Sequence, residues 1–250
     1  ACCWSIIAGP YPQSSLHVPL YHTAFETAGA VASGVRAALD VRGDTETTVL
    51  AWAGDGGTFD IGLQALSGAA ERNENFLYVT YDNEAYMNTG IQRSSATPWG
   101  AWTTTTPYDN PQSTKKKDIL SIMAAHRVPY AATASTAYPE DLLRKVRKAR
   151  DTKGTRFLHI LSPCPPGWKV ADEQTIELGR QAVQNRVFPL LEIENGLDWR
   201  FTMDSAGDPV APYIRAQGRF KHLADDDIQR IQADVDARYE YLQRMVRSSS

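Results

Sequence analysis

A glycine-rich turn has the residue types of a phosphate-binding site. The turn, Gly54-Asp55-Gly56-Gly57, follows an apolar run and precedes a segment with helical spacing. Its glycines would let backbone amides approach phosphate oxygens, and the N-terminus of the following helix adds positive charge. Asp55 would repel a phosphate unless a cation lay between them, and Mg²⁺ bridges protein oxygens and phosphates in this way. The turn therefore predicts a site for a diphosphate with bound magnesium.

Asn83 is the second part of this pattern, because it follows the next apolar run, 76–81. In a parallel sheet the two runs would end at the same edge, where Asn83 would offer its side-chain oxygen to the same ion. Gly54-Asp55-Gly56 followed by Asn83 after one helix and one strand is the signature of thiamine diphosphate enzymes. Taken alone, however, the turn is equally well explained as a plain strand-to-helix connection, with Asn83 capping a loop.

The elements that must position these residues form a regular alternation. Apolar, β-branched runs predict buried strands at 47–53, 76–81, 130–135, 156–162 and 189–194. Segments with helical spacing lie at 23–40, 59–72, 115–126, 139–150, 172–186 and 225–247. Buried strands separated by helices are typical of a parallel sheet that is covered on both faces. We therefore predict an α/β fold, doubly wound, with a mainly parallel sheet and helices on both faces.

Two long segments do not follow this alternation. Residues 84–114 are rich in Thr, Ser, Pro and Asn, and a loop of this length in a compact domain is usually functional or disordered. We expect a functional loop. Residues 198–221 form a second irregular stretch ahead of the charged final helix. We expect a single domain over 1–250, in which 198–250 is a C-terminal extension.

The composition is that of an ordinary globular protein, with 42% hydrophobic residues, 22% charged residues and a net charge of -3. The near-neutral charge gives no overall attraction to nucleic acid or anionic lipid. No apolar run reaches the roughly 18 to 20 residues that span a bilayer, and the first residues lack the order of a signal peptide. We therefore expect a cytoplasmic protein without nucleic-acid or membrane partners.

The stretch from Gly54 to Pro98 resembles the cofactor-binding (beta) subunit of the 2-oxoacid:ferredoxin oxidoreductases, and most closely that of pyruvate:ferredoxin oxidoreductase. The likeness extends over most of the chain, in motifs that occur in the family's order. These motifs are His22–Glu26, Ala30–Gly34, Trp99–Pro107, Ser162–Trp168, Glu192–Gly196 and Gln217–Phe220. The resemblance implies a thiamine diphosphate-binding fold.

The resemblance also implies a set of site residues. Asp55, the side chain of Asn83 and the backbone carbonyl of Ala85 would hold magnesium. Asn88 would reach the diphosphate or the substrate, and Glu26 would contact the cofactor, so these two are the expected catalytic residues. The full cofactor-binding set is Gly54, Asp55, Gly56, Gly57, Asn83, Ala85, Asn88, Thr89 and Glu26. An alternative reading of Glu26 is an acid in the first turn of a helix, stabilised by the helix dipole.

The three cysteines, Cys2, Cys3 and Cys164, form a poor disulfide framework because they are few and unevenly spaced. The resemblance implies instead that Cys164 ligates a four-iron four-sulfur cluster. Alignment on the pairs Tyr11-Pro12 and Val18-Pro19 selects Cys3 as a second ligand and leaves Cys2 as a buried or spare thiol.

A cluster of this type normally has four thiolate ligands, and the family's other two lie in a Cys-x-x-Cys pair upstream of the position of Cys3. We therefore expect that an N-terminal segment of the family precedes Ala1. The alternatives are that another subunit completes the cluster or that the cluster has been lost.

The activity implied is oxidative decarboxylation of a 2-oxoacid with coenzyme A, to acyl-CoA and CO₂, with electrons passed through the cluster to ferredoxin. Pyruvate is the expected substrate because the loop Ser94–Pro107 looks most like the pyruvate enzymes, and oxalate, phenylglyoxylate and 2-oxoglutarate are the alternatives. The family takes its activating glutamate from another subunit or domain, so we expect a hetero-oligomer with an alpha and other subunits. Two other functions stay open: a cluster-free thiamine diphosphate decarboxylase or carboligase, and a non-catalytic structural partner.

Overall fold

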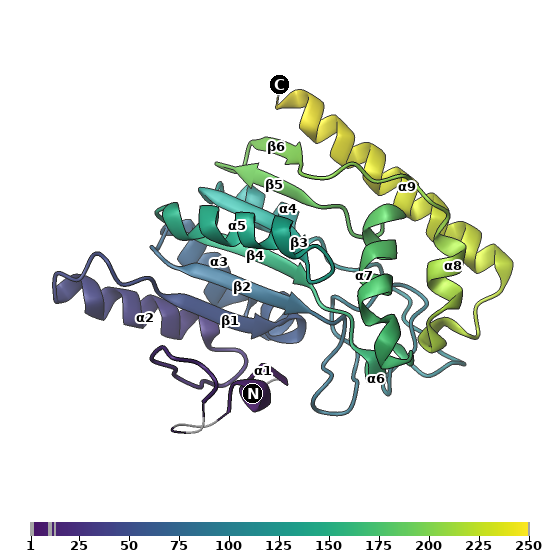
Figure 1. The fold of residues 1–250 in the computed structure, drawn as a ribbon, viewed down its shortest axis with the longest axis horizontal. Helices are drawn as coiled ribbons and strands as arrows, with labels where there is room; N and C mark the ends of the chain where they lie inside the picture. Colours follow the sequence, from purple (N-terminus) through teal and green to yellow (C-terminus); the bar gives the residue numbers. More distant parts are fainter. Residues whose placement is uncertain (1–2, 10–11, 13, 250) are drawn as a thin grey trace.

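One six-stranded sheet forms the centre of the molecule, with the strand order β1-β2-β4-β3-β5-β6 (Figure 1). The computed structural model describes residues 3–9, 12 and 14–249, so Cys2 lies outside the described residues. The strands in that order are β1 (Leu50–Gly54), β2 (Leu77–Asp82), β4 (Arg156–Leu161), β3 (Tyr130–Ser135), β5 (Leu191–Glu194) and β6 (Asp198–Phe201). The first four are parallel to one another, which confirms the predicted mainly parallel sheet.

The last two strands depart from that pattern, because β5 runs antiparallel to β3 and β6 antiparallel to β5. We expected an irregular stretch from residue 198, and this was wrong for β6. The two strands form a hairpin closed by Asn195 and Gly196, which both have positive φ angles, 53° and 71°. An Asn-Gly pair is a strong hairpin signal because both residues tolerate this backbone conformation. The sequence therefore indicated a turn at this position.

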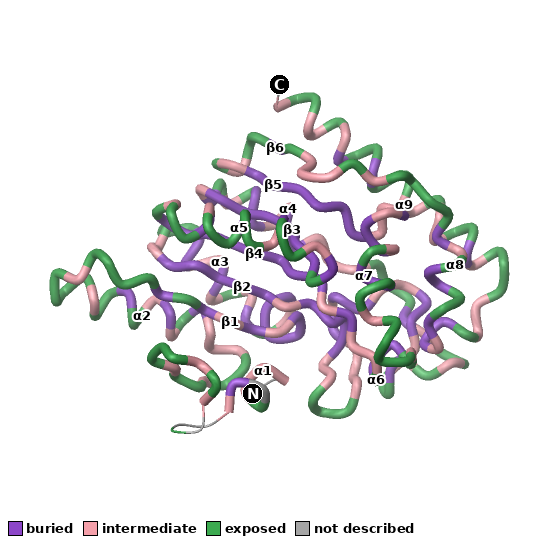
Figure 2. Tube along the Cα trace, viewed as in Figure 1, coloured by how far each residue is buried: buried purple, intermediate pink, exposed green. Residues whose placement is uncertain are grey.

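Helices cover both faces of the sheet, as predicted (Figure 1). On one face, a single apolar core joins the strands to α2 (Ala28–Val41), α3 (Leu63–Glu71), α4 (Ile119–Ala125) and α9 (Asp225–Ser248). On the other face, α5 (Pro139–Asp151) packs on the central strands. The strands are the most continuously buried part of the chain, and Figure 2 shows most of their length in the buried colour.

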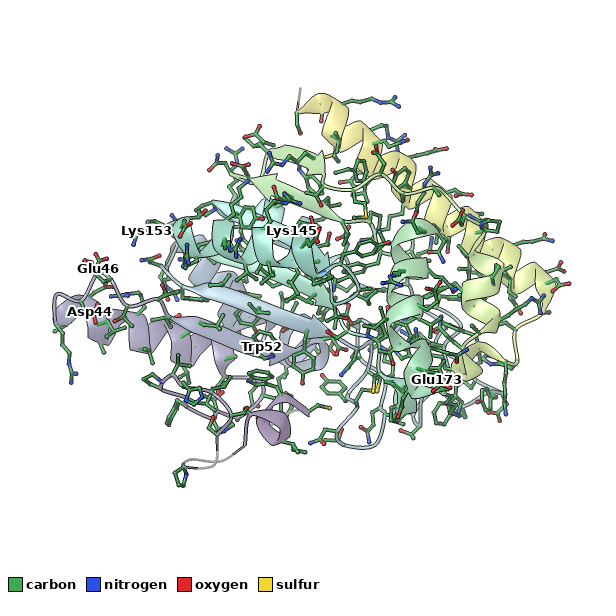
Figure 3. The ribbon with its side chains drawn as sticks, viewed as in Figure 1. Asp44, Glu46, Trp52, Lys145, Lys153 and Glu173 are labelled. Carbon is green, nitrogen blue, oxygen red and sulfur yellow. The ribbon has the colours of Figure 1, made fainter. Side chains whose placement is uncertain are left out.

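The N-terminal helix α1 (Cys3–Ala8) lies beside the edge strand β1. The ring of Trp4 stacks on the ring of Trp52, with centroids 4.5 Å apart, and Figure 3 shows Trp52 on the side of β1 that faces this segment. Since burial of two large aromatic side chains is strongly favourable, this stack holds α1, and with it Cys3, near the edge of the sheet.

A further group of helices gathers near the carboxyl ends of the parallel strands. It contains α6 (Pro165–Trp168), α7 (Thr175–Gln184) and α8 (Val210–Arg215), together with the short 3-10 turns η2 (Asp172–Gln174) and η3 (Gly218–Phe220). A second apolar core around Trp168, Leu190 and Phe220 joins this group. These elements enclose the sheet edge at which ligands bind in open α/β folds.

Three predicted helices begin elsewhere than expected. The segment 23–40 becomes helical only at Ala28, and the segment 115–126 only at Ile119, because Asp118 caps that helix by accepting a hydrogen bond from the Ser121 amide. The segment 59–72 is divided at Gly62 into the π-helical turn η1 (Gly56–Ile61) and α3. A π-helical turn is rare and often lies at a functional site.

The long loop that follows β2 is ordered by backbone hydrogen bonds. The amide of Gly100 donates to Gln112 O at 2.7 Å, and the amide of Trp102 donates to Arg219 O at 2.9 Å. Ser94 and Thr97 are fully buried within it. The loop is therefore part of the packed structure. In the described part of the chain no helix is both long and apolar enough to cross a membrane.

Candidate functional site

A cavity of about 340 Å³ lies where β1 and β2 end. The parallel pairing places Gly54 opposite Tyr81, so the residues that follow the two strands emerge side by side. We call this space the strand-end cavity. Most of the predicted site residues line it, namely Cys3, Gly54, Asp55, Gly56, Gly57, Asn83, Ala85, Asn88 and Thr89. The sequence signature and the β-sheet pairing therefore bring the same residues together.

Three polar groups converge in the strand-end cavity. The side-chain amide of Asn83 lies 2.9 Å from Asp55 Oδ1 and 2.9 Å from the Ala85 carbonyl oxygen. With its nitrogen turned toward these atoms, the amide donates a hydrogen bond to each. With its oxygen turned toward them, three oxygens would lie close together and would repel one another unless a cation lay among them.

These distances can be compared with the geometry of magnesium. In an octahedron with metal–oxygen distances of about 2.0 to 2.1 Å, neighbouring oxygens lie about 2.8 to 3.0 Å apart. The separation of Asn83 from Asp55 and from Ala85 falls within that range. Carboxylate, amide and carbonyl oxygens are also the hard ligands that this ion prefers. The three groups therefore fit a magnesium ion, with its other positions open to phosphate and water.

Asp55 is a buried carboxyl group whose surroundings disfavour its charged form. Its side chain is only 1% exposed, and within the described residues it makes no ion pair. Burial, reinforced by the charge of Asp82, raises the pKa of Asp55 well above its ordinary value. The hydroxyl of Ser94 donates a hydrogen bond to Asp55 Oδ2, which leaves Oδ1 directed at Asn83. Because a buried, unpaired carboxylate is costly, a divalent ion beside Oδ1 would remove the penalty.

The glycines of the turn are required by close contacts. A Cβ at Gly56 would overlap the ring of Tyr86, and a Cβ at Gly57 would lie 2.6 Å from the Phe25 carbonyl oxygen. The Tyr86 hydroxyl lies 3.0 Å from both Gly56 O and Asp60 Oδ2. Tyr86 thus connects the loop after β2 to the turn after β1. The sequence pattern did not single out Tyr86, although the residue lies within the stretch Gly54–Pro98 that resembles the family.

Glu26 lies in the turn before α2, so the alternative of an acid within the first helical turn does not apply. Its Oε2 atom is buried and has no hydrogen-bond partner among the described residues. The neighbouring Phe25 lines the strand-end cavity, whereas Glu26 itself is not among its lining residues. The backbone oxygen of Glu26 lies close to Gly62, at the end of η1. An orphaned buried carboxylate oxygen beside this cavity fits a polar ligand that the chain alone does not supply.

Asn88 and Thr89 are exposed at the mouth of the cavity. They belong to a short turn in which Tyr86 and Gln92 form an antiparallel bridge. Gln92 Nε2 donates a hydrogen bond to Thr89 O at 2.8 Å, which fixes the turn. Their side chains are therefore placed to meet a molecule that enters the cavity from solvent or from a partner.

The two described cysteines differ in their relation to this site. Cys3 lines the strand-end cavity, whereas Cys164 precedes α6 and is not among the residues that line the cavity. Burial raises the pKa of the Cys164 thiol. In the described part of the chain, no three His, Cys, Asp or Glu residues are grouped to hold a metal. Two thiols fit half of a four-thiolate cluster and no more.

Comparison with known proteins gives one matching family model, described as the C-terminal thiamine pyrophosphate-binding domain of thiamine pyrophosphate enzymes, over residues 3–160. The ketoisovalerate oxidoreductase subunit VorB of Pyrococcus abyssi is 51% identical, and the match covers 98% of this chain and 82% of that protein. The pyruvate synthase subunit PorB of Methanocaldococcus jannaschii is also 51% identical, with 96% and 84% covered. That of Methanothermobacter marburgensis is 52% identical, with 94% and 83% covered.

A solved structure is similar as well. It is the 2-oxoglutarate:ferredoxin oxidoreductase from Magnetococcus marinus with 2-oxoglutarate, coenzyme A and succinyl-CoA bound. The TM-score is 0.53 at 27% sequence identity, and the match covers 64% of this chain and 59% of that one.

Proposed function

The chain belongs to the thiamine diphosphate-binding beta subunits of the 2-oxoacid:ferredoxin oxidoreductases, and from this premise we propose that it binds thiamine diphosphate and Mg²⁺ in the strand-end cavity. The observation that carries this proposal is the convergence of Asp55 Oδ1, the Asn83 side chain and the Ala85 carbonyl at 2.9 Å. These three groups would be the protein ligands of the metal. The backbone amides of Gly56 and Gly57 would face the diphosphate, at the N-terminus of η1.

Bound thiamine diphosphate supplies the electron sink that decarboxylation of a 2-oxoacid requires. The residues of this chain hold that cofactor and shape its surroundings. Glu26 would offer its orphaned Oε2 to a polar group of the cofactor, and Asn88 and Thr89 would contact its diphosphate or the substrate at the cavity mouth. Gly54 lines the same cavity at the end of β1.

The reaction we propose is oxidative decarboxylation with coenzyme A to acyl-CoA and CO₂, in the cytoplasm, by a complex with an alpha and other subunits. Cys3 and Cys164 would supply two ligands of a four-iron four-sulfur cluster that passes electrons to ferredoxin. Pyruvate is the proposed 2-oxoacid, because the loop Ser94–Pro107 resembles that of the pyruvate enzymes. The PorB relatives are also named as subunits of pyruvate synthase. Ketoisovalerate is the second candidate, favoured by the equal identity to VorB.

The substrate is tested with the purified complex, supplied with thiamine diphosphate, Mg²⁺, coenzyme A and ferredoxin. We expect ferredoxin reduction that depends on the 2-oxoacid, with a higher kcat/KM for pyruvate than for ketoisovalerate. A higher kcat/KM for ketoisovalerate than for pyruvate would identify ketoisovalerate as the substrate. A complex that binds no thiamine diphosphate would identify the chain as a structural partner.

The cluster is tested by iron content and by the electron paramagnetic resonance signal on reduction. We expect Cys164→Ala to lower both, whereas the control Cys2→Ala, at the predicted spare thiol, leaves them unchanged. A fully assembled complex that contains no iron and still decarboxylates the 2-oxoacid would favour the cluster-free decarboxylase instead.

A further inference from the structure

We propose that Glu84 is a positioning residue for the metal site: its buried ion pairs hold a left-handed backbone turn that directs Asn83 and Ala85 toward Asp55. This inference rests on the proposed function, since it concerns how the chain presents ligands to magnesium. Glu84 lies between the two residues whose oxygens converge with Asp55 Oδ1. Neither the sequence pattern nor the cavity lining singles it out.

The backbone of Glu84 is in an unfavourable conformation. Its φ angle is 69°, in the left-handed region, where a side chain with a Cβ crowds the backbone. For a residue other than glycine this region is disfavoured by about 5- to 30-fold. Glycine would be the ordinary choice at such a turn. Because the chain has a glutamate there instead, other contacts must compensate for the strain.

Those contacts come from parts of the chain that are distant in sequence. The Glu84 side chain is 4% exposed, and its two oxygens make separate ion pairs: Oε1 with Lys116 Nζ at 2.8 Å and Oε2 with Arg219 Nη2 at 2.6 Å. The Arg219 guanidinium also stacks on the ring of Trp168, 4.0 Å from its centroid, and donates a hydrogen bond to Gln217 Oε1. The carboxylate is thus held from both sides.

The backbone of the turn is held as well. The amide of Glu84 donates to Asp82 Oδ1 at 3.0 Å, and its carbonyl oxygen accepts from Thr97 Oγ1 at 2.7 Å. One residue earlier, the carbonyl oxygen of Asn83 accepts from Trp168 Nε1 at 3.0 Å. The peptide groups on either side of the strained residue are therefore fixed by the end of β2, by α6 and by the long loop that contains Thr97.

One of these partners, Lys116, is shared with Asp82, which also pairs with His159. Lys116 Nζ lies 2.5 Å from Asp82 Oδ2, and His159 Nε2 lies 2.6 Å from the same oxygen. Lys116 therefore bridges the residues on either side of Asn83. With its charge committed to Asp82 and Glu84, the lysine is not paired with Asp55, whose carboxylate stays available for a metal ion.

Two substitutions separate the role of the backbone from the role of the charge. Glu84→Ala removes the carboxylate but keeps the Cβ that makes the left-handed turn unfavourable. Glu84→Gly removes the carboxylate and the strain together. Both variants leave the same two cations, Lys116 and Arg219, without the Glu84 carboxylate. The difference in Mg²⁺ affinity between the two variants therefore reports the backbone conformation alone.

The experiment measures the apparent Kd of Mg²⁺ by calorimetry, in the assembled complex at a fixed thiamine diphosphate concentration. We expect Glu84→Ala to weaken Mg²⁺ binding by about 10-fold or more, and Glu84→Gly to bind about 5- to 30-fold more tightly than Glu84→Ala. Glu84→Asn is the second variant, in case the alanine variant does not assemble. Because asparagine tolerates the left-handed region better than alanine does, we expect it to assemble and to bind more weakly than the glycine variant.

A matched control uses Arg127, which has a φ angle of 54° and is exposed after α4, outside the lining of the strand-end cavity. Arg127→Ala and Arg127→Gly should differ in unfolding free energy but not in the Kd of Mg²⁺. The proposal is overturned if the glycine variant binds Mg²⁺ no more tightly than the alanine or the asparagine variant, whether all are weak or all match the wild type. If the wild-type complex itself binds neither Mg²⁺ nor thiamine diphosphate, the proposed function fails first.

Discussion

The side chain of Asn83 lies 2.9 Å from Asp55 Oδ1, although a helical segment and the strand β2 separate the two residues along the chain. The parallel register of β1 and β2, in which Gly54 is opposite Tyr81, produces this contact. A shift of the register would displace Asn83 relative to Asp55, so the pairing of two buried strands determines the metal site.

Glu26→Gln tests whether the orphaned carboxylate serves a ligand. In the absence of cofactor we expect the variant to be at least as stable as the wild type, because Oε2 has no partner among the described residues that the change would remove. Thiamine diphosphate binding and 2-oxoacid-dependent ferredoxin reduction should both fall, by about 10-fold or more. Thermal unfolding and calorimetry measure the two effects. A variant that loses stability but binds the cofactor normally would assign Glu26 a purely structural role.

Gly56→Ala tests the close packing of the turn. The added methyl group overlaps the Tyr86 ring, so we expect a loss of about 1 to 3 kcal/mol in unfolding free energy together with weaker cofactor binding. Gly34→Ala is the control, because a Cβ at this position in α2 meets no described atom within 4 Å. It should stabilise the helix by roughly 0.5 to 1 kcal/mol and leave binding unchanged. Equal effects of the two changes would contradict the packing argument.

The lowered pKa of Lys145 predicts how the unfolding free energy depends on pH. Its side chain is fully buried between α5 and the sheet, where the amino group pairs with Asp141 and donates hydrogen bonds to Thr133 O and to Thr202 Oγ1. Burial lowers the pKa of Lys145 from 10.5 to about 8. Below pH 8 the folded and unfolded chains both carry the proton, and above it the folded chain releases the proton first.

The unfolding free energy should therefore rise as the pH increases from 8 toward 10.5, by up to about 1.4 kcal/mol per pH unit. Denaturant unfolding of the wild type and of Lys145→Met at pH 7.5 and 9.5 measures this, since the other titrating groups are common to both proteins. Between pH 7.5 and pH 9.5, we expect the unfolding free energy of the wild type to increase relative to that of Lys145→Met by roughly 1 to 2 kcal/mol. A difference that stays constant over this range would exclude the lowered pKa.

Local sequence patterns were sufficient for the parallel core and for the turn at Gly54 with Asn83, whereas Cys3, Ala85, Asn88 and Thr89 were expected only from the family resemblance. Buried strands were readable as apolar runs, and the turn at Gly54 and the position of Asn83 followed from their order along those strands. The hairpin of β5 and β6 was missed because β6 has only four residues, although Asn195 and Gly196 were a readable signal.

Other parts of the site could not be read from the sequence. Lys116 and Arg219 meet Glu84 through loops, and no periodicity links residues so far apart. The left-handed backbone of Glu84 is equally invisible, because glutamate does not favour it and only the folded environment imposes it. Local patterns and the family resemblance together thus pointed to the groups that would contact the cofactor, whereas the groups that hold them in place required the tertiary structure.

The most direct test of the metal and diphosphate site is calorimetric binding of thiamine diphosphate, with and without Mg²⁺, to complexes that contain wild-type, Asp55→Asn or Asp141→Asn chains. Asp141 is the matched control, because it is another buried aspartate but is paired with Lys145 on α5. The wild type and Asp141→Asn should bind in a Mg²⁺-dependent way. Asp55→Asn should lose more than about 100-fold in affinity while its cofactor-free form is no less stable than the wild type. Equal affinity of Asp55→Asn and the wild type would contradict the assignment of this site.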